Sequence, residues 1–463
     1  MMRARELGTL FLLAGLAASG RAVAQDAMEG PPHAADGDVM PPMEAPHAKP
    51  MMANVHLGGL KPFVGVTIRY DNIWTTDPND VFFTPREQNI SVVENAIIPE
   101  SGEYIDGFRT KVRFGFKMAD EDALVNGGVR VAVGQNPNPA SSFVPLGEVF
   151  RPTGIGLDMY YLSISPLKGF HVDTDVQVRL DAGKIPNPFW RGEIKSSGFA
   201  SEMIWDNDVN PAGVSGTVII PLNDQVTLRN AASYYVIEDL EDRRFVGLTG
   251  EVNVIADQLL IETEWITGAL AFYSFENLNS GLHAPGVTAP GNVSISPGSN
   301  AYLLGSGIQA TNNRVNYGPG ADGFRVERYR TLNLGIQAHP ELELPELMVR
   351  PHFMIDAILN TTVKDQRVGL AVTAGAVFGD FDKSRVHPFD VWLTYRDVGN
   401  DATLAAIADS DLGRGTGYGG LEATVGYSFA KSLKLQTSYF DFNRWPQRAN
   451  HDRRLFIDLI GKL

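Results

Sequence analysis

The sequence contains no cysteine, so no disulfide framework can stabilise the fold. Beyond the first 24 residues, no run approaches the roughly 20 apolar residues that a transmembrane helix needs. No G-x-S-x-G, H-E-x-x-H or P-loop motif occurs, and His171, His352 and His387 have no nucleophile motif beside them. We therefore predict that the chain is not an enzyme and needs no cofactor.

The balance of charge is acidic. The 463 residues include 54 Asp and Glu against 39 Lys and Arg, which gives a formal net charge of −15. A negative chain is repelled by the phosphate backbone of nucleic acids, so we expect no nucleic acid partner.

The first residues have the three parts of a secretory signal. Arg3 and Arg5 form a short basic region, and Leu7–Ala18 is an apolar run too short to span a bilayer. Ala22-Val23-Ala24 has the small-x-small pattern of a cleavage site. We predict a signal peptide over residues 1–24; the alternative is a membrane anchor.

Residues 25–55 differ in composition from the rest of the chain. They are rich in Pro, Met, Ala and His and show neither a strand nor a helix period. We interpret them as a flexible periplasmic segment that precedes a barrel over residues 56–463. A metal-binding tail is the alternative, although His33, His47 and His56 lack regular spacing.

Alternation of apolar and polar residues dominates the remaining sequence. In Phe108–Met118, Thr110, Val112 and Phe114 face one way while basic residues face the other. Val172–Asp181 likewise alternates Val, Thr or Leu with charged residues and one Gln. A soluble sandwich would not place so many charges on an inward face, whereas a membrane barrel shows lipid on one side and water on the other.

About sixteen such segments occur, the usual size of a porin-like barrel. Their connections alternate, with short turns near residues 121, 167, 223, 256, 342, 384 and 430. The predicted strands are Leu60–Trp74, Phe108–Met118, Val129–Val133, Leu157–Ile164, Val172–Asp181, Val214–Leu222, Val226–Val236, Val246–Val254, Leu259–Trp265, Phe324–Ala338, Leu347–Ile355, Val368–Phe378, Phe389–Tyr395, Leu421–Phe429, Leu433–Tyr439 and Leu455–Leu463.

This pattern predicts an all-β fold, a transmembrane antiparallel up-and-down β-barrel. Ala256-Asp257 is expected to be a turn, and Ala271–Asp322 the longest loop. An even strand count places both termini on one side, which we take as periplasmic, and the last strand can pair with the first to remove the sheet edges.

The residues between the lipid-facing positions should line a water-filled lumen. The predicted basic pore-lining residues are Arg109, Lys111, Arg113, Lys117, Arg130 and Arg179. The predicted acidic residues of the pore and its constriction are Asp173, Asp175, Asp181, Glu193, Glu202, Asp206, Asp208, Glu262 and Glu264. Opposed basic and acidic walls would set a transverse field that favours small polar solutes.

Loop three, Pro186–Asn210, is the candidate constriction because its aromatic residues could fold it against the barrel wall. Within it, Asp206, Asp208 and Asn210 have the spacing that begins a calcium loop. Pro211 stands where that loop needs glycine, so the calcium site is a minor alternative and we predict no metal site.

Four parts of the chain resemble the outer-membrane porin family of Gram-negative bacteria. They are the signal peptide, Gly183–Arg191, Ile204–Gly213 and the terminal strand. The resemblance implies a channel, and commonly a homotrimer, in the cell outer membrane. Its expected partners are outer-membrane lipid, lipopolysaccharide, the barrel-assembly machinery and small polar solutes.

We therefore predict a porin, a passive diffusion channel for small hydrophilic solutes and ions with a loop-three constriction. A plugged barrel that serves as an envelope-structural or adhesion protein through its long extracellular loops is the main alternative. A barrel enzyme and a soluble secreted β-protein are the others.

Overall fold

The computed structural model describes residues 59–75, 104–118, 123–133, 144–145, 155–169, 174–192, 203–206, 209–238, 252–277, 328–340, 342–344, 347–379, 389–404, 407–408, 416–430, 432–444 and 451–462. The chain divides into two units, Met1–Asn54 and Val55–Leu463. All described residues belong to the second unit. The predicted signal peptide and the proline-rich segment up to residue 55 lie outside the described residues, and they stay predictions.

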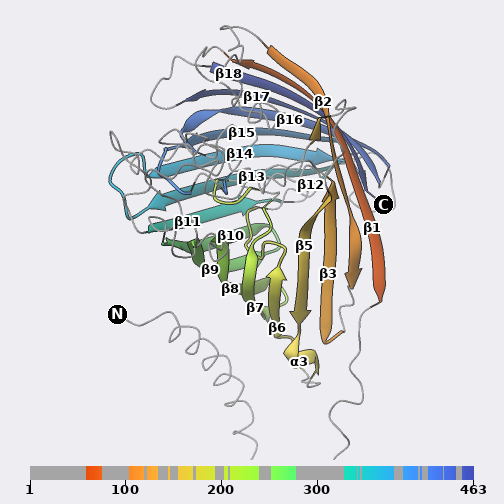
Figure 1. The fold of residues 1–463 in the computed structure, drawn as a ribbon, viewed down its shortest axis with the longest axis vertical. Coiled ribbons are helices and arrows are strands. Elements are labelled where there is room, and N and C mark those ends of the chain that lie inside the picture. The colour runs from red at the N-terminus through yellow and green to blue at the C-terminus, as the bar shows by residue number, and fades with distance from the viewer. Residues whose placement is uncertain are drawn as a thin grey trace, which may run out of the picture. The chain divides into compact units, whose positions relative to one another are not determined.

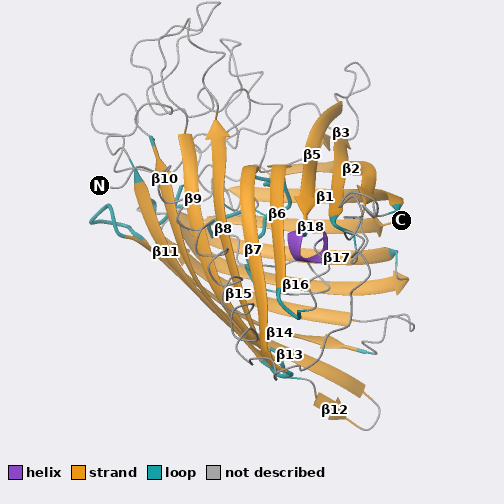
Figure 2. Cartoon of the chain, turned by 90° about the horizontal axis from the view of Figure 1, so that it is seen from below, coloured by secondary structure: helices purple, strands orange, loops and turns teal. Residues whose placement is uncertain are grey.

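The described residues are nearly all in strands, with one four-residue helix (Figure 1). The helix α3 (Pro166–Gly169) forms the predicted short turn near residue 167 (Figure 2). The strands are β1 (Leu60–Thr75), β2 (Tyr104–Met118), β3 (Val125–Val133), β4 (Val144–Pro145), β5 (Ile155–Ile164), β6 (Gln177–Lys184), β7 (Ala212–Asn223), β8 (Val226–Glu238), β9 (Val252–Thr263), β10 (Ile266–Glu276), β11 (Tyr329–Ala338), β12 (Leu342–Leu344), β13 (Leu347–Asn360), β14 (Val368–Phe378), β15 (Phe389–Val398), β16 (Tyr418–Ala430), β17 (Leu433–Arg444) and β18 (His451–Lys462).

All strands belong to one antiparallel sheet that closes on itself. Two of the 18 labelled strands are short continuations: β4 extends the line of β3 along β2, and β12 extends the line of β11 along β13. The ring therefore has 16 positions, each paired with its neighbours along the chain. The predicted 16-stranded up-and-down barrel is confirmed.

The seam of the barrel joins the two ends of the sheet. β1 pairs with β2 on one side and with β18 on the other, in a register that sets Ile68 opposite Leu459 and Tyr70 opposite Ile457. Because β18 also pairs with β17, the described strands leave neither terminal strand with an unpaired edge. The sequence-based pairing of the first and last strands is thus confirmed.

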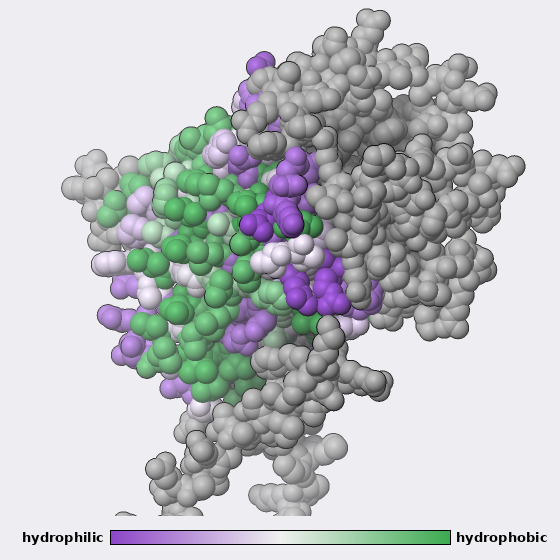
Figure 3. Space-filling view, turned by 90° about the vertical axis from the view of Figure 1, so that its left-hand side faces the viewer, coloured by the Kyte–Doolittle hydropathy of each residue, from purple (hydrophilic) through white to green (hydrophobic). Residues whose placement is uncertain are grey.

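Side chains alternate between an exposed outer face and a covered inner face. On β15, Val391, Leu393 and Tyr395 are exposed while Trp392 and Arg396 are buried. Leu393 is 52% exposed, and many large apolar residues on other strands are comparably exposed. Figure 3 shows these hydrophobic side chains gathered over the outside of the strands. A face of this kind suits hydrocarbon rather than water.

The largest apolar cluster lies inside the barrel. It combines inward-facing residues of several strands with residues of three connecting segments, among them Trp205, Val363 and Leu404. A 16-stranded barrel is too wide for its wall side chains to fill. These segments supply the missing atoms, so part of the interior is packed like the core of a soluble protein.

Three sequence predictions of element boundaries were wrong. The Ala256-Asp257 pair lies inside β9, and the tight turn comes at Glu264-Trp265. The loop predicted from Ala271 starts too early, because β10 continues to Glu276. The strand predicted from Val172 starts only at Gln177. The two errors around β9 and β10 cancel, which is why the predicted strand count survives.

Candidate pore constriction

Loop three leaves the wall through a narrow stem. β6 ends at Lys184 and β7 begins at Ala212, and the Ile185 amide donates to the Pro211 carbonyl over 2.8 Å. This hydrogen bond prolongs the pairing of the two strands by one step. The two ends of the loop are therefore held together where they leave the sheet.

Aromatic side chains fold the loop back onto the inner wall. Phe189 and Trp205 are only 4% and 2% exposed. Both make edge-to-face contacts with Tyr235 of β8 and Tyr273 of β10, with ring centroids 5.3–6.3 Å apart. Such tilted pairs add about 0.5–1.5 kcal/mol each beyond the burial of area. The aromatic residues that are frequent in loop three therefore hold it against the wall, as predicted from the sequence.

Polar side chains fix the loop's backbone. The Gln258 amide on β9 accepts from the Trp190 backbone N–H at 2.6 Å and donates to the Trp190 carbonyl at 2.8 Å. The Arg229 guanidinium on β8 donates to the Pro188 carbonyl at 2.6 Å. Arg191 in turn donates to the carbonyls of Trp205 and Asp206, which ties the two halves of the loop together.

Glycine allows the loop to lie close to the wall. A Cβ placed on Gly335 of β11 would stand 2.9 Å from Cζ3 of the Trp190 indole. Trp190 otherwise packs against Leu260, Ala269 and Met354, all on the inner face. The loop therefore depends on the missing side chain at Gly335.

We expect Gly335→Ala to displace the Trp190 ring and loosen loop three. The added methyl overpacks the contact, which typically costs about 1–3 kcal/mol. Trypsin cleavage after Arg191 in detergent should become faster than in the parent protein. Gly268→Ala on β10 is the matched control, because nothing lies within 4 Å of its Cβ position. Equal cleavage rates in both variants would contradict the role assigned to Gly335.

The described residues of a second connecting segment, 399–416, also fold inward; they are 399–404, 407–408 and 416. The Tyr329 hydroxyl donates to the Asp401 carboxylate at 2.8 Å, and the Asn360 amide donates to the Asp401 carbonyl at 2.8 Å. The segment meets loop three where the Asp206 N–H donates to the Ile407 carbonyl at 2.7 Å. The described parts of both segments therefore lie against the same part of the inner wall.

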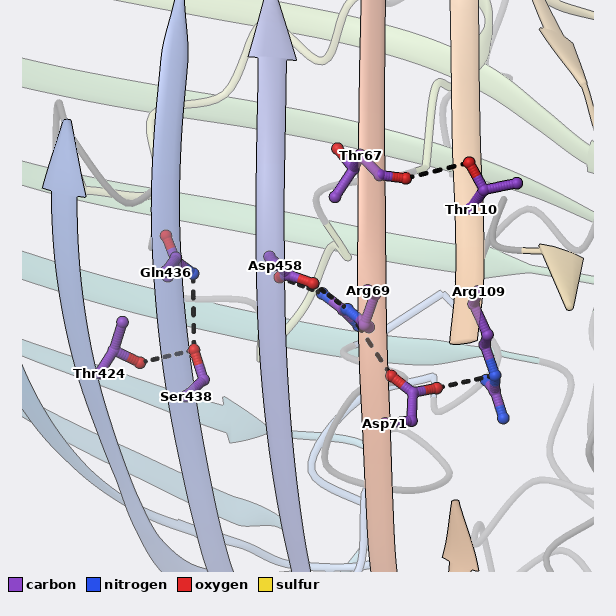
Figure 4. A network of polar contacts seen from close by, with 9 residues as sticks. All are labelled: Thr67, Arg69, Asp71, Arg109, Thr110, Thr424, Gln436, Ser438 and Asp458. Carbon is purple, nitrogen blue, oxygen red and sulfur yellow. Dashed lines mark hydrogen bonds and ion pairs between the residues drawn. The ribbon is translucent and has the colours of Figure 1, made fainter. Parts of the chain in front are cut away.

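The opposite part of the wall carries charges. Arg69 of β1 binds Asp458 of β18 through two hydrogen bonds of 2.8 and 3.1 Å. Asp71 lies 2.7 Å from the Nε atom of Arg109 on β2 and 4.0 Å from that of Arg69 (Figure 4). These four side chains form a chain of alternating sign across the seam, so their charges balance.

One carboxylate further along serves two arginines. The Nε atoms of Arg113 and Arg130 lie 3.0 and 2.6 Å from the same oxygen of Asp158. The Asn210 amide donates to the other oxygen at 3.1 Å. A bulge between Arg130 and Val131 in the pairing of β3 with β5 leaves Asp158 as the extra residue and turns it inward.

The other predicted pore residues are placed as follows. Lys111 is half-buried and Lys117 exposed, both on β2; Arg179 lies 2.9 Å from Asp181, which also accepts from the Ser163 hydroxyl. Asp206 is buried. Asp175, Glu262 and Glu264 are exposed, and none of them takes part in the loop-three contacts described above. Asp173, Glu193, Glu202 and Asp208 lie outside the described residues.

The predicted pore-lining residues did not include Arg69, Asp71, Asp158, Lys184 or Asp458. The signal for Arg69 and Asp71 was present, because they alternate with Ile68 and Tyr70 in the first predicted strand. No alternation could have indicated Asp158, which depends on the bulge. Along the described wall both signs alternate side by side, whereas most of the acidic residues predicted at loop three lie outside the described residues, so the predicted opposition of basic and acidic walls stays a prediction.

No group of three or more metal-ligating residues occurs among the described residues. The suggested calcium loop includes Asp208, outside the described part, and Asn210, whose amide is bound to Asp158. Within the described ranges, no helix is long and apolar enough to cross a membrane.

Comparison with protein families decides the identity of the chain. A family model described as "Putative porin" matches residues 65–296, half of the chain. The chain belongs to this porin family. Membership indicates an outer-membrane channel rather than an enzyme. The resemblance to outer-membrane porins that the sequence indicated is thereby confirmed.

Solved structures similar to this porin are themselves porins. OprB of Pseudomonas putida is 9% identical, with a TM-score of 0.46 over 88% of this chain and 94% of OprB. OmpF of Salmonella typhi, in complex with daunomycin, is 10% identical, with a TM-score of 0.45 over 87% of this chain and 97% of OmpF. A mutant Rh. blastica porin is 9% identical, with a TM-score of 0.40 over 88% and 100%. The comparison with curated proteins found no match.

Proposed function

We propose that this porin is a passive channel for small hydrophilic solutes and ions, with its narrowest point beside loop three. The observation that carries the proposal is the uneven filling of the lumen. Among the described residues, those of loop three and of the segment 399–416 pack against inner-face residues of β8, β9, β10, β11 and β13, while β18, β1, β2, β3 and β5 present paired charges. A polar solute would pass along the charged wall.

The charged wall is suited to contact with water. The side chains of Arg109, Arg113 and Arg130 are 17–23% exposed, although each lies within 3.0 Å of a carboxylate. A fixed array of charges favours hydrated polar solutes over apolar ones. The basic and acidic roles predicted for the pore-lining residues remain part of this proposal.

The remaining features of the proposal follow from the barrel and the family. Residues 1–24 would direct export, and residues 25–55 would form a periplasmic segment. The 16-position ring places both ends of the sheet on one side, which we assign to the periplasm, and the long loops on the other. We also propose a homotrimer in contact with lipid and lipopolysaccharide, inserted by the barrel-assembly machinery.

Planar-bilayer recording tests the channel. Purified, refolded protein should give stable ohmic steps in KCl, and liposomes that contain it should swell in small sugars. Folding is checked beforehand by heat-modifiable gel migration. Folded protein that gives no steps and no swelling would reject the proposal.

The plugged barrel is the second candidate, and a specific observation favours it. The apolar cluster of two inward-folded segments includes residues with no exposed surface, such as Met203, Ala402 and Leu404. If this packing continued across the lumen, the protein would act through its outer loops. The same recording separates the two candidates, because a plugged barrel does not conduct.

A further inference from the structure

A hydrogen-bonded polar pair lies on the outer face of the barrel. The Asn230 amide on β8 donates to the Asp257 carboxylate on β9 at 2.7 Å. The residues on either side of Asp257 face the lumen, because Ala256 belongs to the inner apolar cluster and Gln258 binds loop three. Side chains alternate along a strand, so Asp257 points outward, as the exposed Leu259 does.

The pair lies near the middle of the membrane-crossing wall. Asp257 is the sixth of the twelve residues of β9, and a tilted strand needs about 9–11 residues to cross the hydrocarbon. On the other described strands, the outward-facing charged side chains lie close to the strand ends. Asp441 and Arg453, which pair at 3.3 Å near the ends of β17 and β18, are an example. Asp257 is thus placed where lipid headgroups do not reach.

Hydrocarbon is a poor neighbour for this pair. A carboxylate has two oxygens that accept hydrogen bonds, and among the described residues only Asn230 donates to Asp257. Lipid tails offer no donor, so a carboxylate on the lipid face destabilises a membrane barrel. A protein surface that keeps lipid away and encloses the pair, with water or with its own donors, removes this cost.

Small residues surround the pair on the same outer face. Gly216 on β7 lies opposite Ala232 on β8, and Ala232 lies opposite Asp257 on β9. On β10, nothing lies within 4 Å of the Cβ position of Gly268, whereas its outward neighbour Leu270 is 55% exposed. Small side chains let a second backbone come close inside a membrane, where polar groups then join the two surfaces.

We propose that the outer face of β7 to β10 is a contact surface between copies of this chain, with Asn230 and Asp257 enclosed in it. The four strands lie side by side (Figure 1). At about 4.8 Å per strand and about 3.3 Å per residue they present roughly 750 Å², close to the roughly 800 Å² that each partner buries in a stable interface. A second copy has the same hydrophobic height, so it covers the pair at the right depth. The inference rests on the homotrimer of the proposed function and names one surface that joins its subunits.

Lipid access to the surface is the first test. The chain has no cysteine, so Gly268→Cys can be labelled at that one position with a small bimane dye. Ala423→Cys, on the exposed outer face of β16, is the control. In vesicles of lipid brominated on the acyl chains, quenching at position 268 should be severalfold weaker than at position 423. Equal quenching of the two folded proteins would overturn the proposal.

Oligomer dissociation in detergent, measured by analytical ultracentrifugation, is the second test. Asp257→Leu should raise the dissociation constant on the order of tenfold, the effect of losing a hydrogen bond to a charged group. Ala232→Trp should raise it at least as much by blocking close approach, whereas Ala423→Trp should leave it unchanged. If lipid covered Asp257 instead, Asp257→Leu would leave the assembly intact and make the barrel melt later, which would overturn the proposal.

Conductance separates this inference from the channel proposal. A folded monomer that gives ohmic steps would overturn the contact surface and the homotrimer but not the channel. An oligomer that dissociates as expected in the variants but gives no steps would support the contact surface and reject the channel. A gel shift on heating confirms that each variant is folded before it is measured.

Discussion

Deleting residues 187–208 should raise the single-channel conductance severalfold and abolish discrimination between small and large sugars. Ile185 and Pro211 are already joined by a backbone hydrogen bond, so the three residues left between them can close the connection. The deletion removes Phe189 and Trp205 from the interior, and each such side chain typically contributes about 3–5 kcal/mol when buried. The barrel should therefore melt earlier but still close, because none of its strands is shortened.

Conductance and sugar-swelling assays measure this result. A milder variant, Gln258→Met, keeps the loop but removes both hydrogen bonds to Trp190. It leaves a buried N–H and C=O without this partner, at a typical cost of about 1–3 kcal/mol each. We expect noisier current at nearly unchanged mean conductance. If the deletion left conductance unchanged, loop three would not be the constriction, and the segment 399–416 would be the next to test.

Ile457→Pro should prevent the barrel from folding. Ile457 pairs with Tyr70 on β1 and with Thr437 on β17, so β18 lies inside the sheet, where proline removes a ladder hydrogen bond and its ring does not fit. If β18 were instead an edge strand, proline would be tolerated at positions whose backbone N–H faces away from the sheet. The expected result is loss of the heat-modifiable band and of membrane insertion.

The control for this prediction is Ile457→Ala. It shortens the same side chain without touching the backbone, so the barrel should still fold. Both variants are compared by gel migration with and without heating. A folded Ile457→Pro protein would show that the β1–β18 pairing does not hold the barrel together.

The sequence predicted the sheet well where one face is uniformly apolar. On β15 the outward-facing Val391, Leu393 and Tyr395 alternate without interruption with the inward-facing residues, and the strand begins at the predicted Phe389. Around Ala256-Asp257 the prediction failed, because small and polar residues imitated a turn inside β9. Asp257 is accommodated there by the Asn230 amide, which donates to it at 2.7 Å.

The constriction was predictable only in part. The aromatic content of loop three indicated that it would fold against the wall, as Phe189 and Trp205 do. Its partners come from strands remote in sequence, such as Gln258, and alternation gives no register between distant strands. The contact of Arg113 and Arg130 with Asp158 depends on the bulge at Asp158, which has no signature in the pattern of apolar residues.

The hydrogen-bonded contact of Arg69 with Asp458 joins residues 389 positions apart. Such a contact has a high entropic cost until everything between is ordered, so ring closure should be the slow, late event in folding. Until β1 pairs with β18, the folding protein has two edge strands with unpaired backbone groups, which can pair with other chains and cause aggregation. A chaperone that binds the unfolded chain on its way to the membrane would prevent this.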